Sequence, residues 1–201
     1  MRAIVSACQV PVIILLIVFA IFIVVVLGTL LGEKISERRH FKVFLPKLLD
    51  ELRACENVEQ VQKTIKGSGL LLRQKKALLE LTRHKSATPS MLESLAASLD
   101  FEEQKRYDSI VKVTDLLARL APMLGLLGTL IPLGPGILAL GSGDTQTLST
   151  AIITAFDTTS LGLIIAGFAL IISSIRKRWY KEYMVAFDTA IEFVLEAVKN
   201  D

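Results

Sequence analysis

The sequence is poor in the residues that build metal sites, disulfides and most catalytic centres. It contains two cysteines, Cys8 and Cys55, and two histidines, His40 and His84, in 201 residues. The histidines stand alone among basic neighbours, and no Cys/His cluster has the spacing of metal ligands. No Ser/His pair or zinc-ligand set points to an enzyme, so we expect no catalytic residue, no metal and no cofactor.

Charge of one sign is not in excess either. The chain has 23 Lys and Arg against 20 Asp and Glu, which leaves a net charge of +3. The basic residues are mixed with acidic ones, and aromatic residues are not interleaved with them as in proteins that stack on bases. We therefore expect no nucleic-acid partner.

The sequence does contain long apolar runs. Hydrophobic residues make up 52% of the chain and gather in three blocks, at about Val10–Gly32, Leu116–Leu140 and Leu148–Ile175. The first block is longer than the ~7–15-residue apolar core of a cleavable signal peptide, and no cleavage site follows it. Because each block can cross a hydrocarbon core of about 30 Å as a helix, the sequence predicts an all-α integral membrane protein with three transmembrane helices.

The distribution of basic residues predicts how these spans are oriented. Arg2 alone precedes the first span, and the short turn at 141–147 has no basic residue. The other basic residues near span ends follow the first and third spans: Lys34, Arg38, Arg39, Lys42, Arg176, Lys177, Arg178 and Lys181. Since Lys and Arg gather on the cytoplasmic side, we expect a cell (plasma or inner) membrane protein with its N-terminus outside and its C-terminus in the cytoplasm. Cys8 and Cys55 then lie on opposite sides and cannot pair.

This topology predicts four parts of the chain. They are an N-terminal transmembrane helix at 1–32, a cytoplasmic helical domain at 33–115, a transmembrane hairpin at 116–176 and a C-terminal cytoplasmic helix at 177–201. The lipid bilayer is thus the first expected partner.

The cytoplasmic domain shows apolar residues at helical spacing. They are Phe44, Leu48, Leu49, Leu52, Leu71, Leu72, Leu78, Leu79 and Leu81. Gly67-Ser68-Gly69 predicts a break between two helices. Thr88 as a cap and Pro89 at the first helical position predict the start of a long helix that runs into the second span.

Both hairpin spans carry a narrow face of small residues. Small residues let helix backbones approach closely in lipid, and those expected to pack here are Gly125, Gly128, Gly162 and Ala166. Pro132 and Pro135 predict a kink in the second span, because each proline removes an N–H donor. The carbonyls that they leave need protein or water partners, which favours a lined cavity.

Hydroxyl groups and one carboxyl group cluster at a single depth in the hairpin. At about 1.5 Å per residue, Thr129 and Thr159 both fall near mid-depth, with Thr154, Asp157 and Thr158 around them. A threonine in a membrane helix often bonds only its own i−4 carbonyl, but a cluster at matched depth favours an ion pathway. A carboxylate near the bilayer centre costs on the order of 2.5–3.5 kcal/mol. Asp157 therefore marks an ion route, or else it stays hydrated near the outer surface or locks helices together.

Two stretches of the hairpin resemble a known family. Residues 121–129 read A-P-M-L-G-L-L-G-T and resemble the P-x-x-G-L-x-G-T signature of the MotA/TolQ/ExbB proton-channel family. Residues 155–163 read A-F-D-T-T-S-L-G-L and resemble that family's A-L-x-x-T-x-x-G-L stretch. The resemblance covers about residues 115–180, and three spans resemble the ExbB/TolQ branch rather than the four-span MotA branch.

The resemblance implies an ion-channel or stator subunit of a complex that is driven by proton-motive force. Such subunits form a homo-oligomeric ring, expected to be a pentamer, around a single-span partner resembling ExbD or MotB that carries a membrane aspartate. By position, Thr129 and Thr159 match the family's two pore threonines. Thr154 stands where ExbB and TolQ have a glutamate five residues before the second threonine, and we hypothesise that Asp157, one turn along, substitutes for it.

Other functions stay open on the residues alone. The hairpin also fits a non-conducting membrane scaffold or assembly protein, and sodium is a less favoured alternative to protons. An intramembrane aspartyl protease needs two membrane aspartates, whereas Asp157 is the one available, so we do not expect an enzyme.

Overall fold

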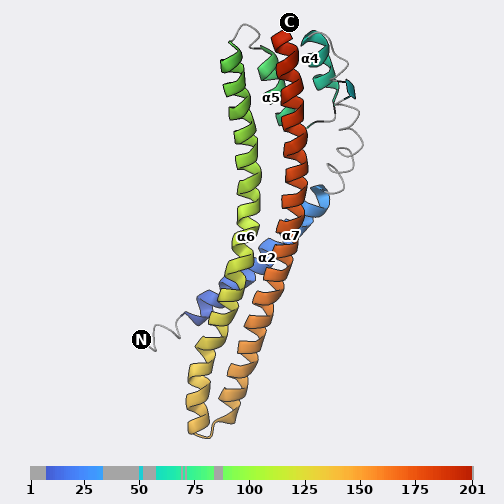
Figure 1. Ribbon diagram of the computed structural model, residues 1–201. Coiled ribbons are helices and arrows are strands. Elements are labelled where there is room, and N and C mark those ends of the chain that lie inside the picture. The colour runs from blue at the N-terminus through green and yellow to red at the C-terminus, as the bar shows by residue number, and fades with distance from the viewer. Residues whose placement is uncertain are drawn as a thin grey trace. The chain divides into compact units, whose positions relative to one another are not determined.

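Helices form every element in the part of the chain that the computed structural model describes, which is residues 8–33, 50–51, 58–68, 70, 72–83 and 88–200. In chain order they are α2 (Gln9–Glu33), α4 (Val58–Gly67), α5 (Leu72–Arg83), α6 (Pro89–Gly141) and α7 (Thr145–Asn200) (Figure 1). Three of these, α2, α6 and α7, are long and apolar enough to cross a membrane. The predicted fold class, an all-helical protein with three membrane-spanning helices, is confirmed.

Some residues used above lie outside the described ranges. They are Arg2, Lys34, Arg38, Arg39, His40, Lys42, Phe44, Leu48, Leu49, Leu52, Cys55, Gly69, Leu71 and His84.

The predicted break after Gly67 and the predicted helix start at Pro89 agree with the described helices. α4 ends at Gly67, at the predicted break. The carbonyl of Thr88 accepts the amides of Met91 and Leu92, at 2.9 and 3.1 Å, which is what the residue before a helix does. From Pro89 onward α6 is one helix of 53 residues, and it continues through Pro122 and both outer prolines.

The turn between α6 and α7 closes the hairpin with very few residues. Gly143 has a φ of 78°, a left-handed conformation that glycine adopts without a steric penalty. The amide of Asp144 then bonds the carbonyl of Ala139 at 2.9 Å. Asp144 begins the next helix by accepting the amide of Thr147 at 3.0 Å through its own Oδ1. The two long helices are therefore antiparallel.

The chain divides into two compact units. Unit 1 comprises Met1–Leu30 and Ile110–Arg176, and unit 2 comprises Leu31–Ser109 and Lys177–Asp201. In unit 1, α2 packs on the hairpin through Val12 and Leu16, which join a core with hairpin residues. The hairpin members of that core are Ala121, Ile131, Ile165 and Ala166.

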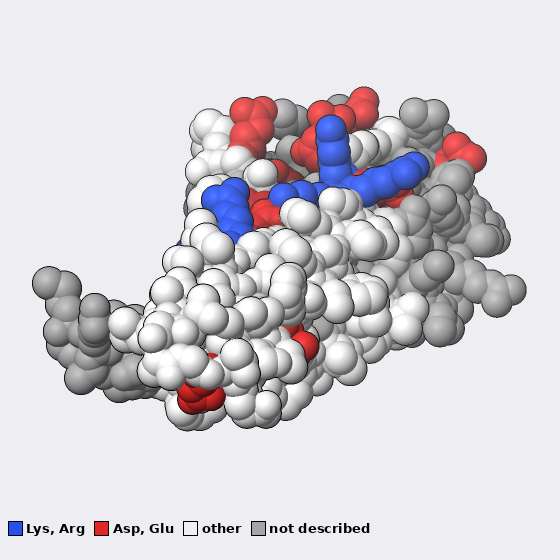
Figure 2. Space-filling model, turned by 90° about the horizontal axis from the view of Figure 1, so that it is seen from below, with Lys and Arg blue, Asp and Glu red and all other residues white. Residues whose placement is uncertain are grey.

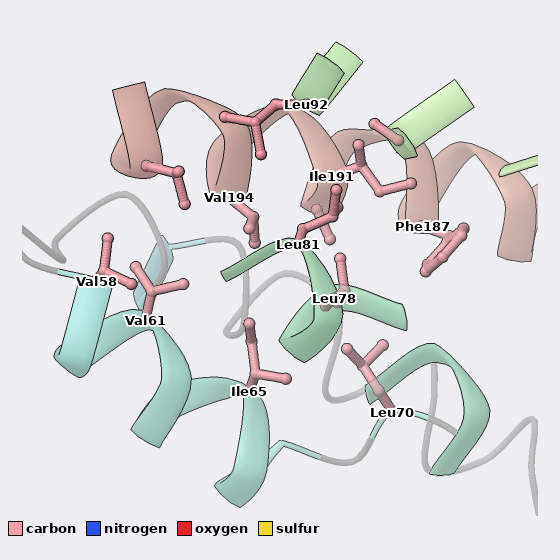
Figure 3. Packing of buried hydrophobic residues seen from close by; sticks show 13 residues of the cluster. Val58, Val61, Ile65, Leu70, Leu78, Leu81, Leu92, Phe187, Ile191 and Val194 are labelled. Carbon is pink, nitrogen blue, oxygen red and sulfur yellow. The ribbon is translucent and has the colours of Figure 1, made fainter. Parts of the chain in front are cut away.

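Unit 2 has a hydrophobic core of its own. Figure 3 shows its side chains converging from α4, α5 and the unit 2 parts of α6 and α7. The labelled members are Val58, Val61, Ile65, Leu70, Leu78, Leu81, Leu92, Phe187, Ile191 and Val194. Four helical segments thus close this core and bury its apolar side chains.

Candidate ion pathway in the hairpin

The two hairpin helices approach so closely in the middle that glycine is required. A Cβ added at Gly162 would lie 2.6 Å from the carbonyl oxygen of Ala121, and one at Gly125 would lie 3.1 Å from that of Thr158. A Cβ at Gly128 would lie 2.8 Å from the Cβ of Thr158. The small-residue faces of the two spans therefore meet each other, as contact between membrane helices at backbone distance demands.

Thr159 is bonded across this contact. Its hydroxyl donates to the carbonyl oxygen of Gly125 on the other helix, at 3.3 Å. In a regular α-helix that same carbonyl accepts the amide four residues later, which is the amide of Thr129. Thr129 and Thr159 thus belong to neighbouring turns that share one carbonyl, and they lie within a turn of each other along the hairpin.

The other hydroxyls of the cluster bond to their own helix. Thr129 donates to the carbonyl of Leu126 at 2.6 Å, and Thr154 donates to that of Thr150 at 3.0 Å. Thr158, with 7% of its surface exposed, donates to its own helix and fills the space over Gly128. Each oxygen keeps lone pairs that accept hydrogen bonds, so Thr129 and Thr154, which are half-buried, present acceptors beside the helix contact.

Asp157 faces away from that contact. It is two residues from Thr159, which puts it about 200° around the helix, and its side chain is exposed in the single chain. Its helix neighbours there are apolar, with Phe156 71% and Ile153 58% exposed. Figure 2 shows a broad white area interrupted by isolated red acidic groups. The acidic residues of unit 1 are Asp115, Asp144 and Asp157.

The comparison with protein families decides where the chain belongs. The family described as the MotA/TolQ/ExbB proton channel family matches residues 69–189, which is more than half of the chain. The chain belongs to this family. A comparison with curated proteins found no match.

Membership of the proton-channel family gives the hairpin its coarse role. It supports a proton-channel, stator-like function for a multi-pass membrane protein that works with partner proteins in a membrane complex. The match includes all of α6 and α7 as far as Thr189, and hence both Thr129 and Thr159. Among the described residues, no three His, Cys, Asp or Glu side chains gather as metal ligands. The roles assigned to Thr129, Thr154, Asp157, Thr158 and Thr159 in ion transfer stay predictions.

Polar contacts that the sequence analysis missed close the base of this family hairpin, at the end opposite to its turn. The hydroxyl of Ser173 donates to Oδ1 of Asp115, which joins α7 to α6. Nη2 of Arg176, a side chain with 7% of its surface exposed, donates to Oγ1 of Thr29 at 3.0 Å and joins α7 to α2. Each span has a polar residue near the end that lies at the base of the hairpin, and this was the signal in the sequence that could have revealed these contacts.

The tip half of the hairpin is different because it contains the prolines. Proline has no N–H, so Pro132 and Pro135 cannot bond the carbonyls of Gly128 and Ile131. The predicted lined cavity has a counterpart here: a pocket of about 300 Å³ lies beside both prolines and Thr154. Gln9 of α2 also lines it, a residue that the sequence analysis did not single out.

Proposed function

We propose that the chain is the ring-forming subunit of a proton-motive-force-driven transducer, assembled around a single-span partner that carries a membrane aspartate. The observation that carries the proposal is the hydrogen bond from the Thr159 hydroxyl to the carbonyl of Gly125, which lies one turn before Thr129 on the facing helix. Hydroxyls from two antiparallel helices at one depth form a polar level in an otherwise apolar hairpin. A partner's carboxylate can exchange a proton there, since hydroxyls both accept and donate hydrogen bonds.

The exposed Asp157 supports an assembly rather than a lone chain. A carboxylate near mid-bilayer costs on the order of 2.5–3.5 kcal/mol when it faces lipid, so such groups face protein or water. In the single chain Asp157 is exposed beside Phe156 and Ile153. A second copy or the partner must then cover this face, and we propose a homo-oligomeric ring, with five copies as in the family resemblance.

We also propose an orientation and a location. Lys and Arg follow the first and third spans, so the positive-inside rule puts 33–115 and 177–201 in the cytoplasm and the hairpin tip outside. Within unit 1 the polar contacts agree with this topology. Thr29 lies with Arg176 at the base of the hairpin, while Gln9 lies with Pro132 and Pro135 in the tip half. The expected location is the plasma or inner membrane.

Proton flux tests the proposal. The complex of this chain with its co-purified partner is reconstituted into vesicles with a trapped pH-sensitive dye, and an imposed gradient drives flux. Thr159→Val removes the hydroxyl that reaches Gly125 and is expected to abolish flux while the complex still assembles. Thr189→Val is the control for the loss of a threonine hydroxyl on the same helix, because Thr189 bonds the i−4 carbonyl of its own helix, at 2.8 Å, and lies in unit 2.

Two outcomes contradict parts of the proposal. If the intact complex carries no proton or sodium flux and Thr159→Val changes nothing, the chain is a non-conducting scaffold or assembly protein. If Asp157→Asn leaves flux intact while Thr159→Val abolishes it, Asp157 has no part in transport and serves only the contact between chains.

A further inference from the structure

The tip half of unit 1 contains a pocket whose lining includes hydroxyl and amide side chains, in a region where a bilayer otherwise offers apolar contacts. Its volume is about 300 Å³, and three helices contribute to its lining. α2 provides Gln9, α6 provides Pro132 and Pro135, and α7 provides Thr147, Thr150 and Thr154 among others. The pocket therefore lies within one chain, between the first span and the hairpin, and not between copies.

The threonines of the pocket form a ladder along one face of α7. Thr147, Thr150 and Thr154 are spaced by three and four residues, so they lie above one another over about 10 Å of helix. Thr158 continues the same spacing to the level of Gly128, next to Thr129. The ladder thus runs from the tip of the hairpin to Thr158, whose buried side chain lies against Gly128 one residue before Thr129.

The ladder is rich in hydrogen-bond acceptors. Thr150 and Thr154 donate their protons to the carbonyls of Gln146 and Thr150, each at 3.0 Å, so their hydroxyl oxygens face outward as acceptors. On the opposite wall, Pro132 and Pro135 leave helix carbonyls without an amide donor. Backbone carbonyls in a membrane need hydrogen-bond donors, and a pocket of about 300 Å³ with polar groups in its lining has room for several waters.

Asp144 sets the charge at the tip end of the ladder. Hydrogen bonds from the side chain and then the backbone of Thr147 lower the pKa of the Asp144 carboxyl below its usual range. The carboxylate is therefore ionised at neutral pH, and it offsets the partial positive charge of the first turn of α7. A cation that approaches the pocket is therefore attracted by the Asp144 carboxylate instead of being repelled by the partial positive charge of the helix N-terminus.

We propose that this pocket is a water-filled inlet within each subunit, through which the transported cation reaches the mid-membrane threonines from the hairpin-tip side. The role of the pocket as an inlet rests on the proposed transport function, whereas the presence of water in the pocket does not. Hydration and transport are therefore measured in separate experiments. The ligand chemistry is a monovalent cation with its water, which covers both the hydronium ion and sodium.

Cysteine accessibility tests hydration. In a Cys8→Ser/Cys55→Ser background, Thr150→Cys and Thr154→Cys are placed in the pocket, with Ile153→Cys as the control, since Ile153 is exposed on α7 but does not line the pocket. A membrane-impermeant, cationic thiol reagent is added from the tip side of vesicles that contain the full complex. Both pocket cysteines are expected to react at least about tenfold faster than Ile153→Cys, because only a hydrated thiol ionises to the reactive thiolate. Equal rates for all three positions overturn the proposal.

Flux before and after labelling tests whether the inlet is on the route. Labelled Thr150→Cys is expected to lose its flux, whereas labelled Ser142→Cys, on the exposed turn outside the pocket lining, is expected to keep it. Runs in sodium-free buffer and with a sodium gradient at constant pH tell the two cations apart. Flux that persists after complete labelling of Thr150→Cys overturns the inlet and leaves the transport function standing. If the unlabelled complex with the native cysteines carries no flux, the transport function itself fails, and the inlet fails with it.

Discussion

The base half and the tip half of the hairpin are held together by different means. In the base half, side chains bond from one helix to another, through Ser173 on Asp115 and Arg176 on Thr29. In the tip half, the hydroxyls of Thr150 and Thr154 bond their own helix, and prolines interrupt the hydrogen bonds of α6. This difference fits the proposal that the tip half holds water, whereas contacts between helices hold the base half together.

The two halves of the hairpin also differ in which atoms of the two helices lie closest to each other. At Gly162, in the base half, an added Cβ would meet backbone, at 2.6 Å from the oxygen of Ala121. At Gly136, in the tip half, it would meet a side chain, at 2.9 Å from the Cβ of Ala151. A clash with a backbone atom cannot be removed by a second substitution, because every residue has that atom. A clash with a side-chain atom is removed when the neighbouring residue is replaced by a smaller one. The comparison therefore predicts that substitutions in the base half cannot be compensated and that those in the tip half can.

The largest effect is expected from Gly162→Val. The new side chain would push α7 away from Ala121 and would also break the register that brings Thr159 to Gly125. We expect a loss of about 3 kcal/mol, at the upper end of the cost of overpacking, seen as a lower Tm of the purified complex in detergent. Gly167→Val is the matched control on the same helix, because nothing lies within 4 Å of its Cβ position. Equal Tm values for the two variants would mean that the close contact in the base half is absent.

A smaller effect is expected where Arg176 joins α7 to α2. Arg176→Met keeps much of the side-chain volume but removes the donor to Thr29, and hydrogen bonds of charged groups contribute about 1.5–3 kcal/mol. Since Arg176 has other interactions as well, Thr29→Val and the double variant complete a thermodynamic cycle. The expected coupling between the two sites is about 1.5 kcal/mol, measured as the non-additivity of the unfolding free energies. Additive losses would show that the bond adds nothing to the stability of the base half.

The tip half is tested by a swap of sizes. Gly136→Ala alone is expected to cost about 1–2 kcal/mol, because its Cβ would lie 2.9 Å from that of Ala151. Gly136→Ala combined with Ala151→Gly exchanges the two Cβ atoms and is expected to recover most of the loss in Tm. Gly134→Ala serves as the control, since nothing lies within 4 Å of Gly134, and alanine there only improves helix propensity. If the double variant is no more stable than Gly136→Ala, substitutions in the tip half cannot be compensated either, and the predicted difference between the two halves is wrong.

Many of the features in this comparison could be predicted from the sequence, and there is a physical reason why the others could not. The spans, the turn and the matched depth of Thr129 and Thr159 follow from counting residues along apolar helices, which is local information. Gln9 and Thr29 were missed because α2 is apolar all round, and its pattern does not reveal which face is buried. That face is set by the packing of Val12 and Leu16 on the hairpin.

The smallest effect is expected at the tip itself, from Asp144. Its carboxyl has a pKa lowered from the usual 3.8, chiefly by the hydroxyl of Thr147 and then by the Thr147 amide. A lowered folded-state pKa means that the ionised group stabilises the fold above pH 3.8, and that this contribution is lost as the pH falls through the folded-state value. Asp144→Asn keeps a capping side chain but does not titrate. The small excess in Tm of the native complex over Asp144→Asn at pH 7 is therefore expected to vanish as the pH is lowered below 3.8. A difference that is constant across this range would show that the charge of Asp144 does not stabilise the tip half, and that the tip is held by the cap geometry alone.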